Sequence, residues 1–118
     1  MKRSLFYAVL AVLMLPTLAF SPIEENLQAR TKVIENTKVQ VQLYNLQEQR
    51  TTFEITDMEE EVSYYKTTIS KHNGFAKILD VSELSDGRYL LKVDNGTTTL
   101  KEIMKVDDKR ILLSGFSE

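Results

Sequence analysis

The chain has 118 residues, with 17 acidic and 15 basic side chains, one histidine and no cysteine. The formal net charge is −2 at pH 7, with acidic and basic residues interspersed, which argues against nucleic acid or an anionic membrane surface as a partner. The lack of cysteine excludes disulfides, and the length supports one domain with one hydrophobic core.

The first twenty residues have the pattern of a cleavable export signal. Two basic residues precede an uncharged apolar run over residues 5–15, which Pro16 ends, and small residues occupy the two positions that a signal peptidase recognises. We expect residues 1–19 to be a signal peptide that is cleaved after Ala19. A retained membrane anchor is the alternative, but the apolar run is shorter than the about 20 residues that span a bilayer.

The mature protein is therefore expected in the periplasm, on the cell surface or outside the cell, without a stable membrane anchor. Residues 20–30 are polar and are expected to form a flexible lead-in to a single domain over residues 31–118.

Short segments with period-2 alternation or many β-branched residues follow, separated by turn residues. We expect strands over residues 31–35, 38–46, 50–56, 62–71, 75–81, 88–94, 97–106 and 110–114. Seven or eight short strands and no helix predict an all-β protein, a small antiparallel β-sandwich of the immunoglobulin or fibronectin type III kind.

Three local features of the sequence predict the turns and an irregularity in the last strands. Asn95 and Gly96 favour a tight two-residue hairpin of type I′, because both accept positive φ angles. The alternation slips between Glu102 and Ile103, which suggests a β-bulge. A further turn is expected at residues 107–108.

One stretch has the pattern of a tyrosine corner. Leu84 ends one strand, Gly87 makes the turn, and Tyr89 enters the next strand two residues later. We expect the Tyr89 ring to share a buried face with Leu91 and Val93, and its hydroxyl to bond a backbone group upstream. These residues, with the turn residues above, are structural candidates.

The run from Val81 to Val106 resembles the last third of the C-terminal sorting domain of the bacterial type IX secretion system, and residues 41–50 are similar to its opening. This resemblance implies an immunoglobulin-like sandwich and an exported protein of a Bacteroidota-type cell envelope. The family usually has proline where this chain has Ser85, and this chain continues past Lys105. A short freestanding exported β-sandwich that shares this ending is the alternative, because we expect no cargo domain before the module.

No arrangement of residues predicts a catalytic, cofactor-binding or metal site. His72 is the only histidine and lies beside a turn, with no nucleophile pattern around it. The acidic run over residues 57–61 lacks the spacing of a calcium loop, so we expect a solvated loop. The acceptor pattern for N-glycosylation at residues 95–97 is explained by the hairpin turn.

These observations favour a non-catalytic exported module with a binding or structural role in the cell envelope and a protein of the envelope or secretion system as partner. The alternatives are a type IX sorting-type domain and a small hydrolase that uses two carboxylates. If Lys109–Glu118 belongs to the fold, we expect residues 36–118 not to carry a fused reporter to the cell surface. The sequence does not define the oligomeric state.

Overall fold

The computed structural model describes residues 26–118. The signal segment, its expected cleavage after Ala19 and the first part of the expected lead-in lie outside the described residues. Residues 26–118 contain only strands and their connections, so no helix among them is long and apolar enough to cross a membrane. The strands are β1 (Gln28–Glu35), β2 (Lys38–Tyr44), β3 (Thr51–Asp57), β4 (Ser63–Ile69), β5 (Phe75–Asp80), β6 (Gly87–Asp94), β7 (Thr99–Asp107) and β8 (Arg110–Leu113).

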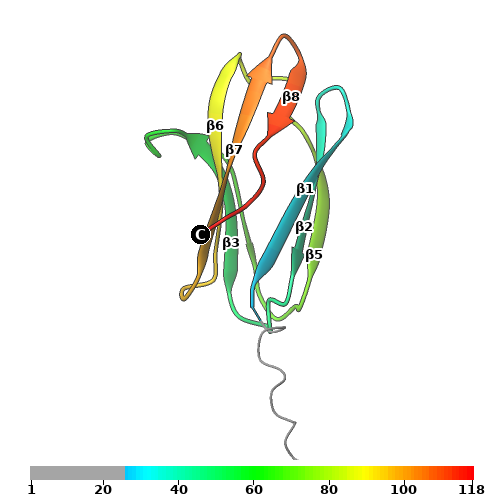
Figure 1. The fold of residues 1–118 in the computed structure, drawn as a ribbon. Coiled ribbons are helices and arrows are strands. Elements are labelled where there is room, and N and C mark those ends of the chain that lie inside the picture. Colours follow the sequence, from blue (N-terminus) through cyan, green and yellow to red (C-terminus); the bar gives the residue numbers. More distant parts are fainter. Residues whose placement is uncertain (1–25) are drawn as a thin grey trace, which may run out of the picture.

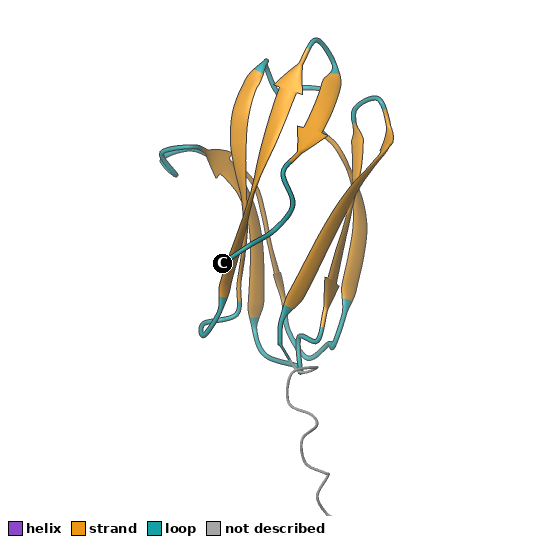
Figure 2. Ribbon diagram, in the orientation of Figure 1, coloured by secondary structure: helices purple, strands orange, loops and turns teal. Residues whose placement is uncertain are grey.

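The strands form two antiparallel sheets that pack face to face (Figures 1 and 2). One sheet has the order β1-β2-β5 and the other has the order β4-β3-β6-β7-β8. The chain crosses between the sheets from β2 to β3, from β4 to β5 and from β5 to β6, whereas the other connections are hairpins. The prediction of an all-β antiparallel sandwich of seven or eight strands is therefore confirmed.

The core lies between the sheets and follows the period-2 pattern of the sequence, because successive side chains of a strand point to opposite faces. Its central residues are less than 2% exposed and come from both layers. They include Val39, Val41 and Leu43 of β2, Phe53 of β3, Leu91 and Val93 of β6, and Met104 of β7.

The first strand begins earlier than the expected range of 31–35. β1 starts at Gln28 and pairs with β2 from that residue onward, and Leu27 just before it is buried in the core. The flexible lead-in was therefore predicted too long, since residues 27–30 belong to the fold. The inward positions in the first half of β1 are Ala29 and Thr31, so the exchange of strongly apolar and polar residues that marks a strand is absent there.

The predicted bulge between Glu102 and Ile103 is wrong. β7 pairs with β6 in one continuous register, from Val106 opposite Gly87 to Thr99 opposite Asp94. Alternation is kept because Glu102 points into the core, with 2% of its surface exposed, and Ile103 points outward.

The β6–β7 hairpin is also wider than predicted. The last pair is Asp94 with Thr99, which leaves a loop of residues 95–98 instead of a two-residue turn. Gly96 has a positive φ of 92°, whereas Asn95 does not have a positive φ. The Asn95 side-chain oxygen instead accepts backbone N–H groups of residues 97 and 98, at 2.9 and 2.7 Å.

The turn between β7 and β8 is centred one residue later than expected. Asp107 pairs with Arg110, so the two turn residues are Asp108 and Lys109. Both have positive φ angles, 51° and 63°, as the two central residues of a type I′ hairpin turn require.

Candidate functional site

The tyrosine-corner segment joins β5 to β6. The Tyr89 hydroxyl donates a hydrogen bond to the backbone oxygen of Ser85, and the Ser85 hydroxyl lies 3.3 Å from the same oxygen atom of Tyr89. Leu84 does not end a strand, since β5 ends at Asp80, but it lies in the loop and packs against the core. Gly87 is the first residue of β6, with a φ of 150°.

A hollow of about 370 Å³ opens next to this corner, between the edge strands β4 and β5. Its apolar lining includes Tyr64, Tyr65, Ile78 and Leu84. Tyr64 is 47% exposed and meets the Tyr89 ring edge-on, with ring centroids 5.3 Å apart. Tyr89 therefore contacts Tyr64, which is one of the residues that line the hollow.

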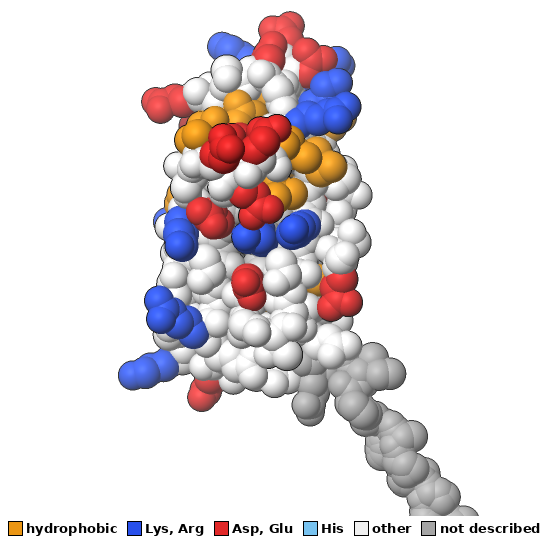
Figure 3. All heavy atoms as spheres, turned by 90° about the vertical axis from the view of Figure 1, so that its left-hand side faces the viewer, with side chains coloured by type: hydrophobic (Ala, Val, Ile, Leu, Met, Phe, Trp, Pro, Cys, Tyr) orange, Lys and Arg blue, Asp and Glu red, His pale blue; other side chains and the backbone are white. Residues whose placement is uncertain are grey.

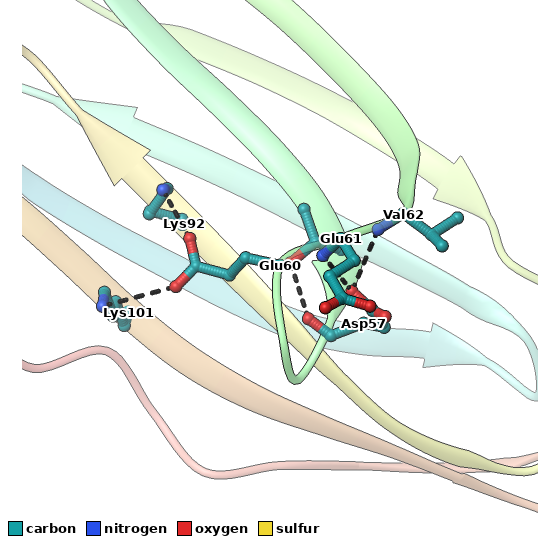
Figure 4. A network of polar contacts seen from close by, with 7 residues as sticks. Asp57, Glu60, Glu61, Val62, Lys92 and Lys101 are labelled. Atoms are coloured by element: carbon teal, nitrogen blue, oxygen red, sulfur yellow. Dashed lines mark hydrogen bonds and ion pairs between the residues drawn. The ribbon is translucent and has the colours of Figure 1, made fainter.

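The acidic run after β3 forms an ordered loop (Figure 4). One carboxylate oxygen of Asp57 accepts the backbone N–H groups of Glu61 and Val62, at 2.7 and 3.1 Å. Within residues 26–118, no group of three or more His, Cys, Asp or Glu side chains is placed to hold a metal ion. Asp57 thus shapes the loop by satisfying backbone donors.

Glu60 connects this loop to the outer face of the five-stranded sheet through ion pairs (Figure 4). One of its carboxylate oxygens lies 2.8 Å from Lys92 Nζ on β6, and the other lies 3.8 Å from Lys101 Nζ on β7. The hydrogen bond from Lys92 is the main cause that lowers the pKa of Glu60, and the same bond raises the pKa of Lys92. The pair is exposed to solvent, so we expect its contribution to stability to be small.

The outer face of this sheet combines acidic, basic and apolar side chains. Figure 3 shows an acidic group on this face, with apolar side chains around it and basic side chains below. Leu90 points to this outer face and lies outside the core cluster, yet only 7% of its surface is exposed. Met58 and Ile103 are among the exposed apolar residues of the molecule.

Glu102 is a buried carboxylate, with only 2% of its surface exposed. One carboxylate oxygen accepts the hydroxyl of Thr31 on β1 at 2.6 Å, and the other accepts the backbone N–H of Gly115 at 2.7 Å. Burial is the main cause that raises the pKa of Glu102. The only signal of this burial in the sequence is the slip in alternation at Glu102, which predicted a bulge and not a buried carboxylate.

The remaining sequence candidates lie apart from these features. His72 lies in the β4–β5 connection, where its backbone oxygen accepts the N–H of Glu48 at 3.1 Å. Asn95 and Gly96 lie in the β6–β7 loop, and the side chain of Asn95 is engaged with that loop's own backbone. The structure thus brings the corner tyrosine beside the hollow and keeps the turn candidates elsewhere.

The fold and these features define a small antiparallel β-sandwich of the immunoglobulin or fibronectin type III kind. Comparison with known proteins places it more narrowly, because the secretion system C-terminal sorting domain matches residues 21–106. This match covers well over half of the chain, and the chain belongs to that family. The resemblance to a type IX sorting domain is confirmed, and membership implies a secreted or exported protein. No match was found among curated proteins or among solved structures.

Proposed function

We propose that this domain is a non-catalytic sorting module, which a protein component of the type IX secretion machinery recognises during export. The family match over residues 21–106 carries the proposal. It favours sorting over the freestanding binding or structural role that the sequence analysis preferred. The partner is then a secretion protein, and neither nucleic acid nor a lipid surface is needed.

The arrangement of the matched segment supports recognition of a folded surface. The match runs from before β1 to the penultimate residue of β7, so it includes both sheets and their shared core. β8 and the residues after it lie beyond the match and pair with the outer edge of β7. A partner therefore meets a closed sandwich rather than an extended tail.

The structure also changes the design of the secretion test. A reporter fused to residues 36–118 was expected to remain inside the cell envelope, but that fragment lacks β1. β1 pairs with β2 along its length and supplies the Thr31 hydroxyl to the buried Glu102. Such a fragment would test an incomplete domain.

The experiment places a reporter between residues 19 and 20 of the full chain in a type IX-competent cell. We expect surface labelling to detect the reporter in this strain, and the reporter to stay periplasmic in a strain that lacks the type IX channel. Val41→Asp tests the need for the fold, because Val41 is fully buried, and Gln40→Asp on the neighbouring position is its matched control.

We expect the Val41→Asp fusion to be retained and the Gln40→Asp fusion to be displayed. Equal surface labelling with and without the channel would overturn the proposal. Retention of the unmodified fusion in the competent strain would also overturn it.

A further inference from the structure

The outer face of the five-stranded sheet places basic side chains directly opposite each other in two pairs. Lys92 of β6 pairs with Lys101 of β7, and Arg88 pairs with Lys105 further along the same two strands. All four side chains alternate with core residues and therefore point to the outer face. Like charges that are directly opposite each other destabilise a sheet, so each pair is stabilised when a carboxylate lies between its members.

The folded chain supplies such a carboxylate to one pair only. Glu60 lies between Lys92 and Lys101, with its two oxygens 2.8 and 3.8 Å from the two Nζ atoms (Figure 4). The ion pairs within residues 26–118 include neither Arg88 nor Lys105. The described part of the chain therefore holds these two cations side by side without a carboxylate at ion-pair distance.

Apolar side chains adjoin this uncompensated pair. Leu112 of β8 is directly opposite Lys105 and is 59% exposed. Ile103 lies two residues before Lys105 on the same face of β7 and is 38% exposed. We call Arg88, Ile103, Lys105 and Leu112 the basic–apolar patch. It combines two exposed cationic groups with two exposed aliphatic side chains on three neighbouring strands.

We propose that the basic–apolar patch binds an acidic segment of a partner protein. A carboxylate of that segment lies between Arg88 and Lys105, in the way that Glu60 lies between the two lysines next to them. An apolar neighbour in the segment packs on Ile103 and Leu112. The guanidinium of Arg88 binds a carboxylate through two parallel hydrogen bonds, and the bound carboxylate also relieves the repulsion between the two cations.

The charge around the patch favours a short acidic segment over a polyanion. Glu59 and Glu61 are exposed in the loop that Glu60 connects to the same face, and the chain has a net charge of −2. These negative charges repel a nucleic acid or an anionic membrane, whose charges extend past the two cations. The inference goes beyond the sorting function, because it concerns a ligand that purified protein binds without any secretion machinery.

The test titrates the full, isotopically labelled chain with a peptide of residues 57–62 and follows the backbone amide signals by NMR. This peptide has three glutamates between Met58 and Val62. It is the probe because it repeats the segment that supplies Glu60 to the neighbouring lysines. The control peptide has asparagine and glutamine in place of the four acidic residues, and we expect it to bind at least about tenfold more weakly.

The variant that tests the patch is Arg88→Gln with Lys105→Gln, which removes both cations. Its matched control is Arg30→Gln with Lys32→Gln, which removes one arginine and one lysine from exposed positions of β1 in the other sheet. We expect the first double variant to bind the acidic peptide at least about tenfold more weakly than the native chain or the control, as the loss of two exposed ion pairs implies. Leu112→Ala should weaken binding severalfold. If the double variant folds poorly, Lys105→Gln beside Lys32→Gln provides the same comparison.

Each of five results would overturn the proposal. Equal binding of the acidic and amide peptides would show that charge is not recognised, and equal weakening in both double variants would show a response to net charge alone. Signal changes centred on Lys92 and Lys101 would show that the peptide displaces Glu60. Tighter binding of a DNA oligonucleotide with the same charge would assign the patch to a polyanion. Unchanged signals in the native chain would show that the patch binds no acidic segment.

Discussion

Tyr89 and Glu102 each carry a polar group into the core, and each finds its partners close by. Tyr89 needs one acceptor, which the backbone of Ser85 supplies four residues upstream. Glu102 needs donors for two oxygens, and these come from Thr31 on β1 and from Gly115 after β8. A neutral phenol costs little once it is bonded, whereas burial disfavours the charged carboxylate.

The hydroxyl of Tyr89 can be tested by removing it. We expect Tyr89→Phe to lower the free energy of unfolding by about 1 kcal/mol, because the buried Tyr89 side chain loses its partly buried hydrogen bond to the Ser85 carbonyl. Arg88→Ala is the control, since Arg88 is exposed on the opposite face and should change stability by less than about 0.5 kcal/mol. Chemical denaturation measures both, and equal losses would show that the corner bond is not stabilising.

The raised pKa of Glu102 predicts a pH dependence of stability. A buried acid whose folded pKa exceeds its usual value of 4.5 holds its proton more tightly in the folded state. Its contribution to stability is therefore present at low pH and is lost as pH rises through the folded pKa. Glu102→Gln removes this loss, because the amide oxygen can accept the Gly115 N–H while the NH₂ donates to Thr31.

We expect the unfolding free energy of Glu102→Gln, relative to the native chain, to increase between about pH 4 and pH 7. Denaturation at a series of pH values measures this difference directly. A difference that stays constant over this range would show that Glu102 does not titrate with folding.

At the scale of the elements, alternation in the sequence located the strands whose inward positions are strongly apolar. β2 and β3 show a regular exchange of polar and apolar residues, and both lie inside their sheets with strongly buried inward positions. The turn types were harder to predict. Asn95-Gly96 is compatible with several loops, and the side chain of Asn95 selected a wider one by bonding two backbone N–H groups.

The two larger errors have a common physical origin, since a pattern of hydropathy does not report which polar residues are buried. Charged residues are seldom buried without partners, so an inward Glu102 looked like a break in the strand. Its partners, Thr31 and Gly115, are far from it along the chain, and only the folded register brings them together. β1 was predicted to start too late because its first inward residues, Ala29 and Thr31, are small or polar.

The sequence also could not predict the ion pairs of the acidic loop, because they join residues that are far apart along the chain. Glu60 binds Lys92 and Lys101, two lysines that become neighbours only when β6 and β7 pair, where they are directly opposite each other. By contrast, the tyrosine corner was accessible from the sequence, because donor and acceptor are four residues apart in one segment.

At the scale of the whole molecule, the two open sides of the sandwich differ. Between β4 and β5 the side is hollow and lined by apolar residues such as Tyr64 and Ile78. Between β1 and β8 the two layers are linked, because Glu102 bonds Thr31 of β1 and Gly115 after β8, and β8 contacts β1. The end of the chain is therefore a structural part of the domain, and it covers the edge of β7 as far as Ser117.

Deletion of Lys109–Glu118 tests this conclusion. Of the three apolar residues in β8, only Ile111 is fully covered, at 8% exposure, whereas Leu112 is 59% exposed. Loss of Ile111 alone removes about 1.5–3 kcal/mol of burial, and Leu113 and Phe116 add partial burial. Because a domain of this size is stable by about 5–15 kcal/mol, we expect the deletion to lower the urea midpoint strongly or to unfold the chain.

Two substitutions in the full chain separate the effect of losing a buried side chain from the effect of shortening the chain. Ile111→Ala should cost about 2–5 kcal/mol, as truncation of a buried isoleucine does, and Leu112→Ala on the neighbouring exposed position should stay within about 0.5 kcal/mol. Urea denaturation of the three variants beside the native chain gives the comparison. If the deletion left the midpoint unchanged, residues 109–118 would lie outside the cooperative unit, and β7 would be a true edge of the sheet in solution.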